Sequence, residues 1–121
     1  MHLFSIRRLL GLREKPLSEW SVSLAADGFE ITHPKGDFKR VQWGQVARIS
    51  TYKQDCYVYD MIVVELEVGD QSFRVTEADA GWSDFCEAMQ TRFSSIPGDW
   101  YQQVMFPPFE TNFQVLWSRQ A

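Results

Sequence analysis

The sequence of 121 residues contains few of the side chains that build metal centres and thiol-based active sites. It has only two cysteines, Cys56 and Cys86, which lie 30 residues apart without a CxxC motif or a neighbouring histidine. This spacing gives no support to a zinc site or a thioredoxin-type redox pair, and we expect reduced thiols in a cytoplasmic protein. The common nucleotide, zinc-protease and calcium motifs are also absent, so we predict no cofactor and no metal.

Long apolar runs are missing as well. No apolar stretch approaches the roughly 18 residues that a membrane-spanning helix requires. Arg7 and Arg8 interrupt the apolar residues near the N-terminus, and no small-residue cleavage site follows, which argues against a signal peptide. The 45% apolar content and the 15% aromatic content instead predict a single globular domain with one core.

The net charge of -4 is unevenly distributed. Residues 1–15 carry four cations and one carboxylate, a charge of +3, so residues 16–121 carry -7. An acidic body is repelled by phosphate backbones, and we therefore expect no nucleic-acid partner. The same acidity would complement a basic protein, which keeps an immunity or inhibitor function open as an alternative.

The N-terminal residues 1–15 are predicted to form an amphipathic helix that precedes a single α+β domain over residues 16–121. The candidate membrane contacts are Leu3, Ile6, Arg7, Arg8 and Leu10. The apolar members form one helical stripe with the arginines beside it. Two interpretations stay open: the helix packs on the domain's own sheet, or it lies on an anionic membrane surface and makes the protein a peripheral membrane protein.

Apolar and polar side chains alternate with a period of two from Trp20 to residue 76, which predicts antiparallel strands. In the first strand, Trp20, Val22 and Leu24 share one face. Turn signals such as Asp27-Gly28 and Gly69-Asp70 separate the segments. The six expected strands lie near residues 20–24, 29–32, 38–43, 49–52, 57–68 and 73–76.

The period becomes helical after residue 76. Four large apolar side chains recur at i, i+3, i+7 and i+11: Trp82, Phe85, Met89 and Phe93. This spacing predicts a C-terminal helix packed on the sheet. A second short helix is expected from Asp99 to Met105, followed by a final strand in which Phe113, Val115 and Trp117 face the core.

Six short antiparallel strands followed by an aromatic-rich helix resemble the pleckstrin-homology-type (PH-like) barrel of small bacterial proteins, over residues 20–95. The residues that carry the resemblance are the segment 29–32, the Trp43-x-x-Val46-x-x-Ile49 step, the strand 57–68 with its Gly69-Asp70 turn, and the segment 73–76 leading into the Trp82 helix. The resemblance implies a strongly bent antiparallel sheet or a partly open barrel of six to seven strands, working as a binding platform without catalysis.

Two features depart from this family. The first hairpin turn, residues 25–28, lacks the lysines and arginines that phosphoinositide-binding members place there, so lipid-phosphate recognition is not implied. About 25 residues also follow the helix, where a simple barrel would have ended. This tail fits an alternative α+β sheet in which the last strand inserts beside an earlier one.

The long strand at residues 57–68 carries the candidate interaction surface. Ile62, Val64 and Leu66 form a core face, yet the opposite face is apolar in its first half. The members of this second face are Tyr57, Tyr59, Met61 and Val63. We therefore expect a non-enzymatic protein-interaction module that binds a protein partner or a second copy of itself.

Other polar residues support weaker alternatives. The basic cluster Lys35, Lys39 and Arg40 is a candidate anion contact or a solvated turn. His33 and Asp60 are the positions that an enzyme or a small-ligand carrier would use, although neither has a recognisable nucleophile nearby. We predict no catalytic residues.

Overall fold

In the computed structural model, residues 18–56, 59–107 and 110–119 are described. The predicted N-terminal helix and its candidate membrane contacts lie outside these ranges. The described residues form an α+β fold of seven strands and two α-helices. The elements are β1 (Ser21–Ala25), β2 (Gly28–Thr32), β3 (Phe38–Gln42), the 3-10 turn η1 (Trp43–Gln45), β4 (Arg48–Asp55), β5 (Asp60–Val68), β6 (Gln71–Thr76), α2 (Trp82–Arg92), α3 (Trp100–Met105) and β7 (Gln114–Ser118).

The strands form two antiparallel sheets, and the described part of the chain contains no closed barrel. The three-stranded sheet has the order β1-β2-β3, and the four-stranded sheet has the order β6-β5-β4-β7. The turn η1 lies between β3 and β4 and redirects the chain, so that β4 pairs with β5 and β7. The α+β class and the antiparallel strands are thus confirmed, and the last strand inserts beside an earlier one.

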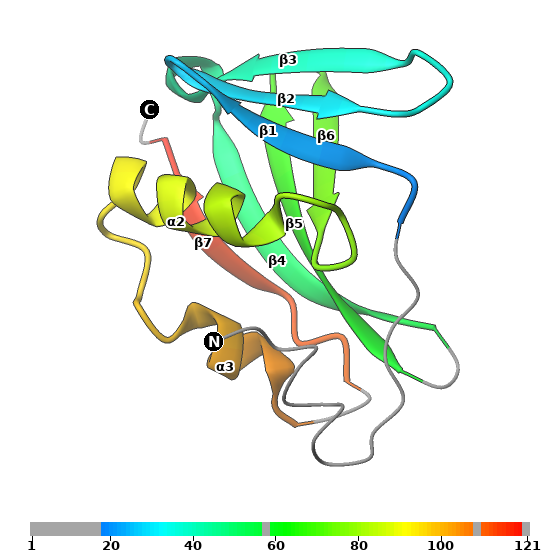
Figure 1. Ribbon diagram of the computed structural model, residues 1–121. Helices are drawn as coiled ribbons and strands as arrows, with labels where there is room; N and C mark the ends of the chain where they lie inside the picture. The colour runs from blue at the N-terminus through cyan, green and yellow to red at the C-terminus, as the bar shows by residue number, and fades with distance from the viewer. Residues whose placement is uncertain (1–17, 57–58, 108–109, 120–121) are drawn as a thin grey trace.

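The core lies on one face of the four-stranded sheet. Figure 1 shows the three-stranded sheet crossing one end of this face, with α2 and α3 covering the remainder. The predicted core face of β5 and the predicted apolar stripe of α2 both enter this core. Phe29 of β2 and Phe85 of α2 meet edge to face, with ring centroids 5.0 Å apart. Burying each such ring contributes about 1.5–3 kcal/mol.

The alternation expected in β7 is wrong. Trp117 packs on Phe93, the residue that follows α2, with ring centroids 4.5 Å apart, but Val115 and Phe113 are 49% and 55% exposed. A register shift explains the difference, because Ile49 of β4 pairs with Trp117 while the next residue of β4 pairs with Val115. Such a bulge places one extra residue in β7 and breaks the period of two.

The first strand is attached to the connection between β6 and α2. The backbone N–H of Ser18 donates to the carbonyl of Ala78, and that of Val22 donates to the carbonyl of Ala80. Of the three side chains expected on the inner face of this strand, only Val22 is buried, whereas Trp20 and Leu24 are exposed. The connection ends at Gly81, whose φ of 89° is left-handed.

We predict that Gly81→Ala destabilises the fold more than Gly36→Ala. Both glycines have left-handed φ angles, so an alanine costs about 1–2 kcal/mol of backbone strain at either position. Only at Gly81 would the new Cβ also collide, lying 1.9 Å from the carbonyl oxygen of Val22. Overpacking adds about 1–3 kcal/mol. Urea unfolding of the two variants measures the difference, and equal losses would show that β1 does not approach Gly81 this closely.

Candidate functional site

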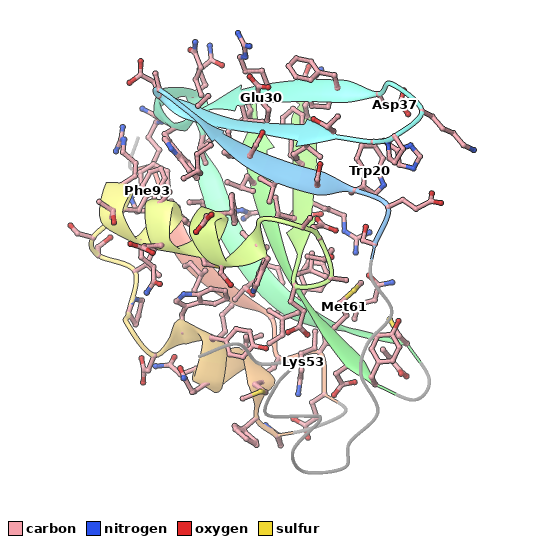
Figure 2. The ribbon with its side chains drawn as sticks, in the orientation of Figure 1. Trp20, Glu30, Asp37, Lys53, Met61 and Phe93 are labelled. Atoms are coloured by element: carbon pink, nitrogen blue, oxygen red, sulfur yellow. The ribbon has the colours of Figure 1, made fainter. Side chains whose placement is uncertain are left out.

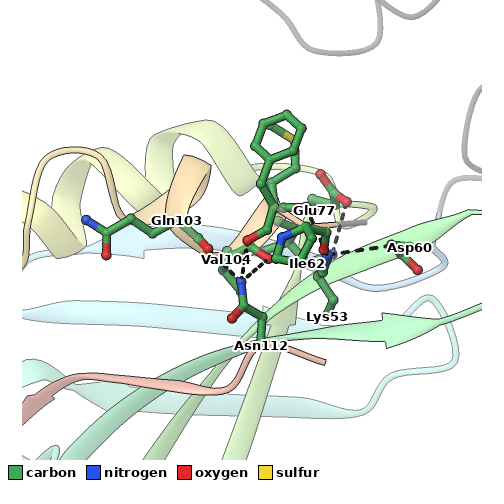
Figure 3. A network of polar contacts seen from close by, with 10 residues as sticks. Lys53, Asp60, Ile62, Glu77, Gln103, Val104 and Asn112 are labelled. Atoms are coloured by element: carbon green, nitrogen blue, oxygen red, sulfur yellow. Dashed lines mark hydrogen bonds and ion pairs between the residues drawn. The ribbon is translucent and has the colours of Figure 1, made fainter. Parts of the chain in front are cut away.

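A buried lysine organises the polar contacts beneath α3. Lys53 of β4 is 4% exposed, and its Nζ donates to the carbonyl of Met105 at 2.9 Å and to the carbonyl of Pro107. Asp60 lies beside it, with 3.8 Å between the amine and the nearest carboxylate oxygen (Figure 3). Met105 is the last residue of α3, so this cation stabilises the negative end of the helix.

Asn112 binds the same end of α3 from the other side. Its Nδ2 donates to the carbonyls of Gln103, Val104 and Phe106, at 2.7, 3.3 and 2.6 Å. These carbonyls belong to the last turn of the helix or the residue that follows it, where intrahelical donors run out. A structural clamp formed by Lys53, Asp60 and Asn112 therefore holds α3 against β4, and Asp60 is part of it.

Glu77 is a second buried polar residue, and it forms hydrogen bonds with the backbone of β5. Its Oε1 accepts from the N–H of Ile62 at 3.0 Å, and its own N–H donates to the carbonyl of Ile62 at 3.1 Å. Its Oε2 accepts from the hydroxyl of Tyr101 at 2.5 Å. The carboxylate thus extends the β5–β6 ladder by one residue and connects it to α3.

Neither cysteine forms a disulfide. Burial raises the pKa of the Cys86 thiol well above its ordinary value, and the nearby negative charge of Glu77 raises it further. Because the thiolate is the nucleophilic form, Cys86 stays protonated and unreactive at neutral pH.

His33 lies at the end of β2 and supports a tryptophan. Its Nε2 lies 3.0 Å from the Glu19 carboxylate, and its ring packs on Trp20 with centroids 4.7 Å apart. Neither His33 nor Asp60 lines any of the three grooves described below. Their positions outside these grooves therefore give no support to a catalytic or ligand-binding role for either residue. The absence of enzymatic activity stays a prediction.

The three cations of the predicted anion contact point to different places. Arg40 pairs with Glu30 on the outer face of the three-stranded sheet, with 2.8 Å between guanidinium and carboxylate. Lys39 is the next residue along β3 and faces the opposite way. Lys35 lies in the turn after β2, where its backbone N–H donates to the Nδ1 of His33.

The four residues of the predicted interaction surface also lie in different environments. Tyr57 lies outside the described residues, and Val63 is fully buried. Tyr59 and Met61 are half-buried. The pKa of the Tyr59 phenol is raised by burial and by its contact with Cys56, so the phenol is neutral at neutral pH.

Tyr59, Met61 and Lys39 meet in one groove, which we call the inter-sheet groove. It has a volume of about 560 Å³ and lies where the three-stranded sheet diverges from β5 and β6. Figure 2 shows Trp20 and Met61 on the same side of the molecule. The side chains that line it are Ser18, Trp20, Ile31, Lys39, Gln54, Tyr59, Met61, Ser72, Phe73, Arg74, Thr76, Ala78 and Asp79. The contributions of Trp20, Phe73 and Arg74 could not be recognised from the sequence, because strand periodicity does not specify which sheets lie together.

A second apolar region lies on the outer face of the four-stranded sheet, opposite the core. Phe113 stacks on Tyr52 of β4 with ring centroids 6.4 Å apart, and Val115 follows on β7. A groove of about 540 Å³ is lined by Ser95 and residues 115–119, along the side of β7 that has no strand neighbour among the described residues. We call this strand side, together with Phe113 and Val115, the β7 edge. The sequence assigned both side chains to the core.

The third groove, of about 940 Å³, lies between α2 and α3 and is acidic. Asp84 and Glu87 line it, and the described residues of its lining include no lysine or arginine. Its other two carboxylates already accept hydrogen bonds, since Glu77 binds Tyr101 and Asp79 binds the backbone and hydroxyl of Thr76. The groove is therefore negatively charged, but both of its buried carboxylates already accept hydrogen bonds from the protein, so neither indicates a ligand.

Comparison with known proteins found no matching family model, no matching curated protein and no matching solved structure. In the described ranges, no group of three or more histidine, cysteine or carboxylate side chains is arranged to hold a metal ion. None of the helices in the same ranges has the length and apolar content needed to cross a bilayer.

We predict that Lys53→Ala lowers the free energy of unfolding by about 3–5 kcal/mol, because it leaves a half-buried carboxylate and two carbonyls without this cation. Lys39→Ala is the matched control, since Lys39 is exposed and should change stability by less than about 0.5 kcal/mol. Chemical denaturation measures both. A small loss for Lys53→Ala would show that the clamp does not hold α3.

Proposed function

We propose that this protein is a non-enzymatic interaction module that associates with a second copy of itself through the β7 edge. The observation that carries this proposal is that β7 pairs on one side only among the described strands, with exposed apolar side chains beside it. The PH-like resemblance adds to it, since that family uses antiparallel strands and a helix as a binding platform without catalysis.

The free side of β7 supports strand pairing. Among the strands of the described residues, β7 is the last of its sheet and has β4 as its only neighbour. The flanking backbone bonds also run toward β4, from Lys53 to Thr111 and from Arg119 to Ala47. Half of the N–H and C=O groups of an edge strand point outward and can pair with another strand.

The composition of β7 supports a second copy as the partner. Edge strands usually carry charged residues or proline that prevent pairing with another chain, but residues 114–118 contain neither. Two identical uncharged strands can therefore pair antiparallel about a two-fold axis without like-charge repulsion, although the whole chain carries -4. Such pairing would bring the exposed Phe113 and Val115 of both copies together on one continuous sheet.

We expect Val115→Glu to weaken self-association by about ten-fold or more, because each copy would place a carboxylate in the contact opposite the other. Leu24→Glu is a matched control. Leu24 is also on an edge strand and is 50% exposed, against 49% for Val115. Sedimentation velocity over a range of concentrations measures the dissociation constants, and circular dichroism checks that both variants stay folded.

Two results would contradict the proposal. The first is a wild-type protein that stays monomeric up to millimolar concentration. The second is a dimer that Leu24→Glu disrupts and Val115→Glu does not, because that result would move the contact to the three-stranded sheet. A stable monomer that bound a basic protein would instead favour the inhibitor function.

A further inference from the structure

We propose that the inter-sheet groove binds a small amphipathic carboxylate, with an apolar ring or chain and one acidic group. This site is separate from the β7 edge and does not depend on self-association. Its volume of about 560 Å³ lies within the range of roughly 300–1,000 Å³ that is usual for small-molecule sites.

The apolar wall of the groove comes from several elements. Trp20 precedes β1, and Ile31 belongs to β2. Tyr59 immediately precedes β5, Met61 belongs to β5, and Phe73 belongs to β6. Three of these side chains are aromatic and present flat surfaces, while the flexible Met61 can adapt to different ligand shapes. The described residues of the lining include no histidine or cysteine, and the activity that these groups support is binding without chemistry.

Trp20 is held in place before any ligand arrives. Its ring packs on that of His33, with centroids 4.7 Å apart, and its backbone N–H donates to the Oγ of Ser18 at 3.0 Å. A wall that is already ordered loses little conformational entropy when a ligand binds. This support matters because Trp20 is partly exposed and would otherwise sample several rotamers.

Two cations give the groove its preference for an acid. Lys39 comes from β3 and Arg74 from β6, so each sheet contributes one. Within the described residues, the ammonium of Lys39 has no hydrogen-bond or ion-pair partner, and the guanidinium of Arg74 donates only to the neutral amide of Gln54. Both charges are therefore available for charge-assisted hydrogen bonds to a carboxylate.

One carboxylate, Asp79, also lines the groove. It is buried, and its two oxygens accept from the backbone N–H and the hydroxyl of Thr76 at 2.9 and 3.0 Å. Among the described residues, the lining thus carries two cations against one carboxylate that is already hydrogen-bonded, in a protein whose net charge is negative. A single carboxylate balances the remaining charge, whereas a polyphosphate would need more cations than the lining supplies.

Titration with decanoate tests the site, using calorimetry for affinity and amide NMR shifts for location. We expect saturable binding with shifts at Trp20 and Met61, and a loss of affinity of about ten-fold or more in both Lys39→Gln and Arg74→Gln. Arg40→Gln is the matched control, because Arg40 is the neighbour of Lys39 on the opposite face of β3 and already pairs with Glu30. Its affinity should equal that of the wild type.

The uncharged analogue decanol and the cation decylammonium separate charge recognition from apolar burial. Both should bind about ten-fold or more weakly than decanoate. The proposal is overturned if decanoate does not bind at millimolar concentration, if either analogue binds equally well, or if Arg40→Gln has the same effect as Lys39→Gln. Tighter binding of a short peptide with a C-terminal phenylalanine would also overturn it, in favour of a protein terminus.

Sedimentation velocity with and without decanoate keeps this test apart from the one for the β7 edge. We expect the dimer dissociation constant to be unchanged by decanoate, and Val115→Glu to bind decanoate with wild-type affinity. A decanoate affinity that fell in Val115→Glu would show that the ligand occupies the β7 edge, and would contradict the assignment to the inter-sheet groove.

Discussion

The two sheets and both helices are connected by the segment 76–81, and its central contact is the carboxylate of Glu77. This side chain accepts from the backbone of β5 and from Tyr101 of α3. The carbonyl of Ala78 accepts from the segment before β1, and that of Ala80 accepts from β1. The segment then enters α2 directly. A carboxylate held by two donors in a buried position is costly to disturb, because the loss of one donor leaves a poorly solvated charge. Thr76, Ala78 and Asp79 of this segment also line the inter-sheet groove.

The elements with strong periodicity could be predicted from the sequence. Residues 62, 64 and 66 alternate through the core face of β5, and the helical spacing from Trp82 to Phe93 identifies α2. The short helix before Pro107 was also predictable, because proline prevents its continuation. Local alternation does not report which strand pairs with which, so one bent sheet and two separate sheets were equally compatible with the pattern.

The remaining differences have specific physical causes. Val115 was assigned to the core because an extra residue in β7 cannot be seen in a sequence whose apolar side chains still alternate. Lys53 gave no signal of burial, since a lysine on a strand normally extends into water, and its partners are carbonyls more than 50 residues away. Of the candidate site, the sequence identified Lys39, Tyr59 and Met61 as two unrelated patches. Their proximity is a tertiary property, as is the contribution of Trp20 and Arg74.

The position of β7 next to β4 has a consequence for the newly synthesised chain. β4 pairs with β5 through neighbouring residues, but its other edge is completed only by a strand more than 60 residues later. Until residues 114–118 have left the ribosome, β4 presents an open edge and Phe93 lacks the indole that packs against it. Contacts between such distant residues form late in folding, and an open hydrophobic edge is prone to aggregation. The nascent chain is therefore prone to aggregation until β7 has emerged.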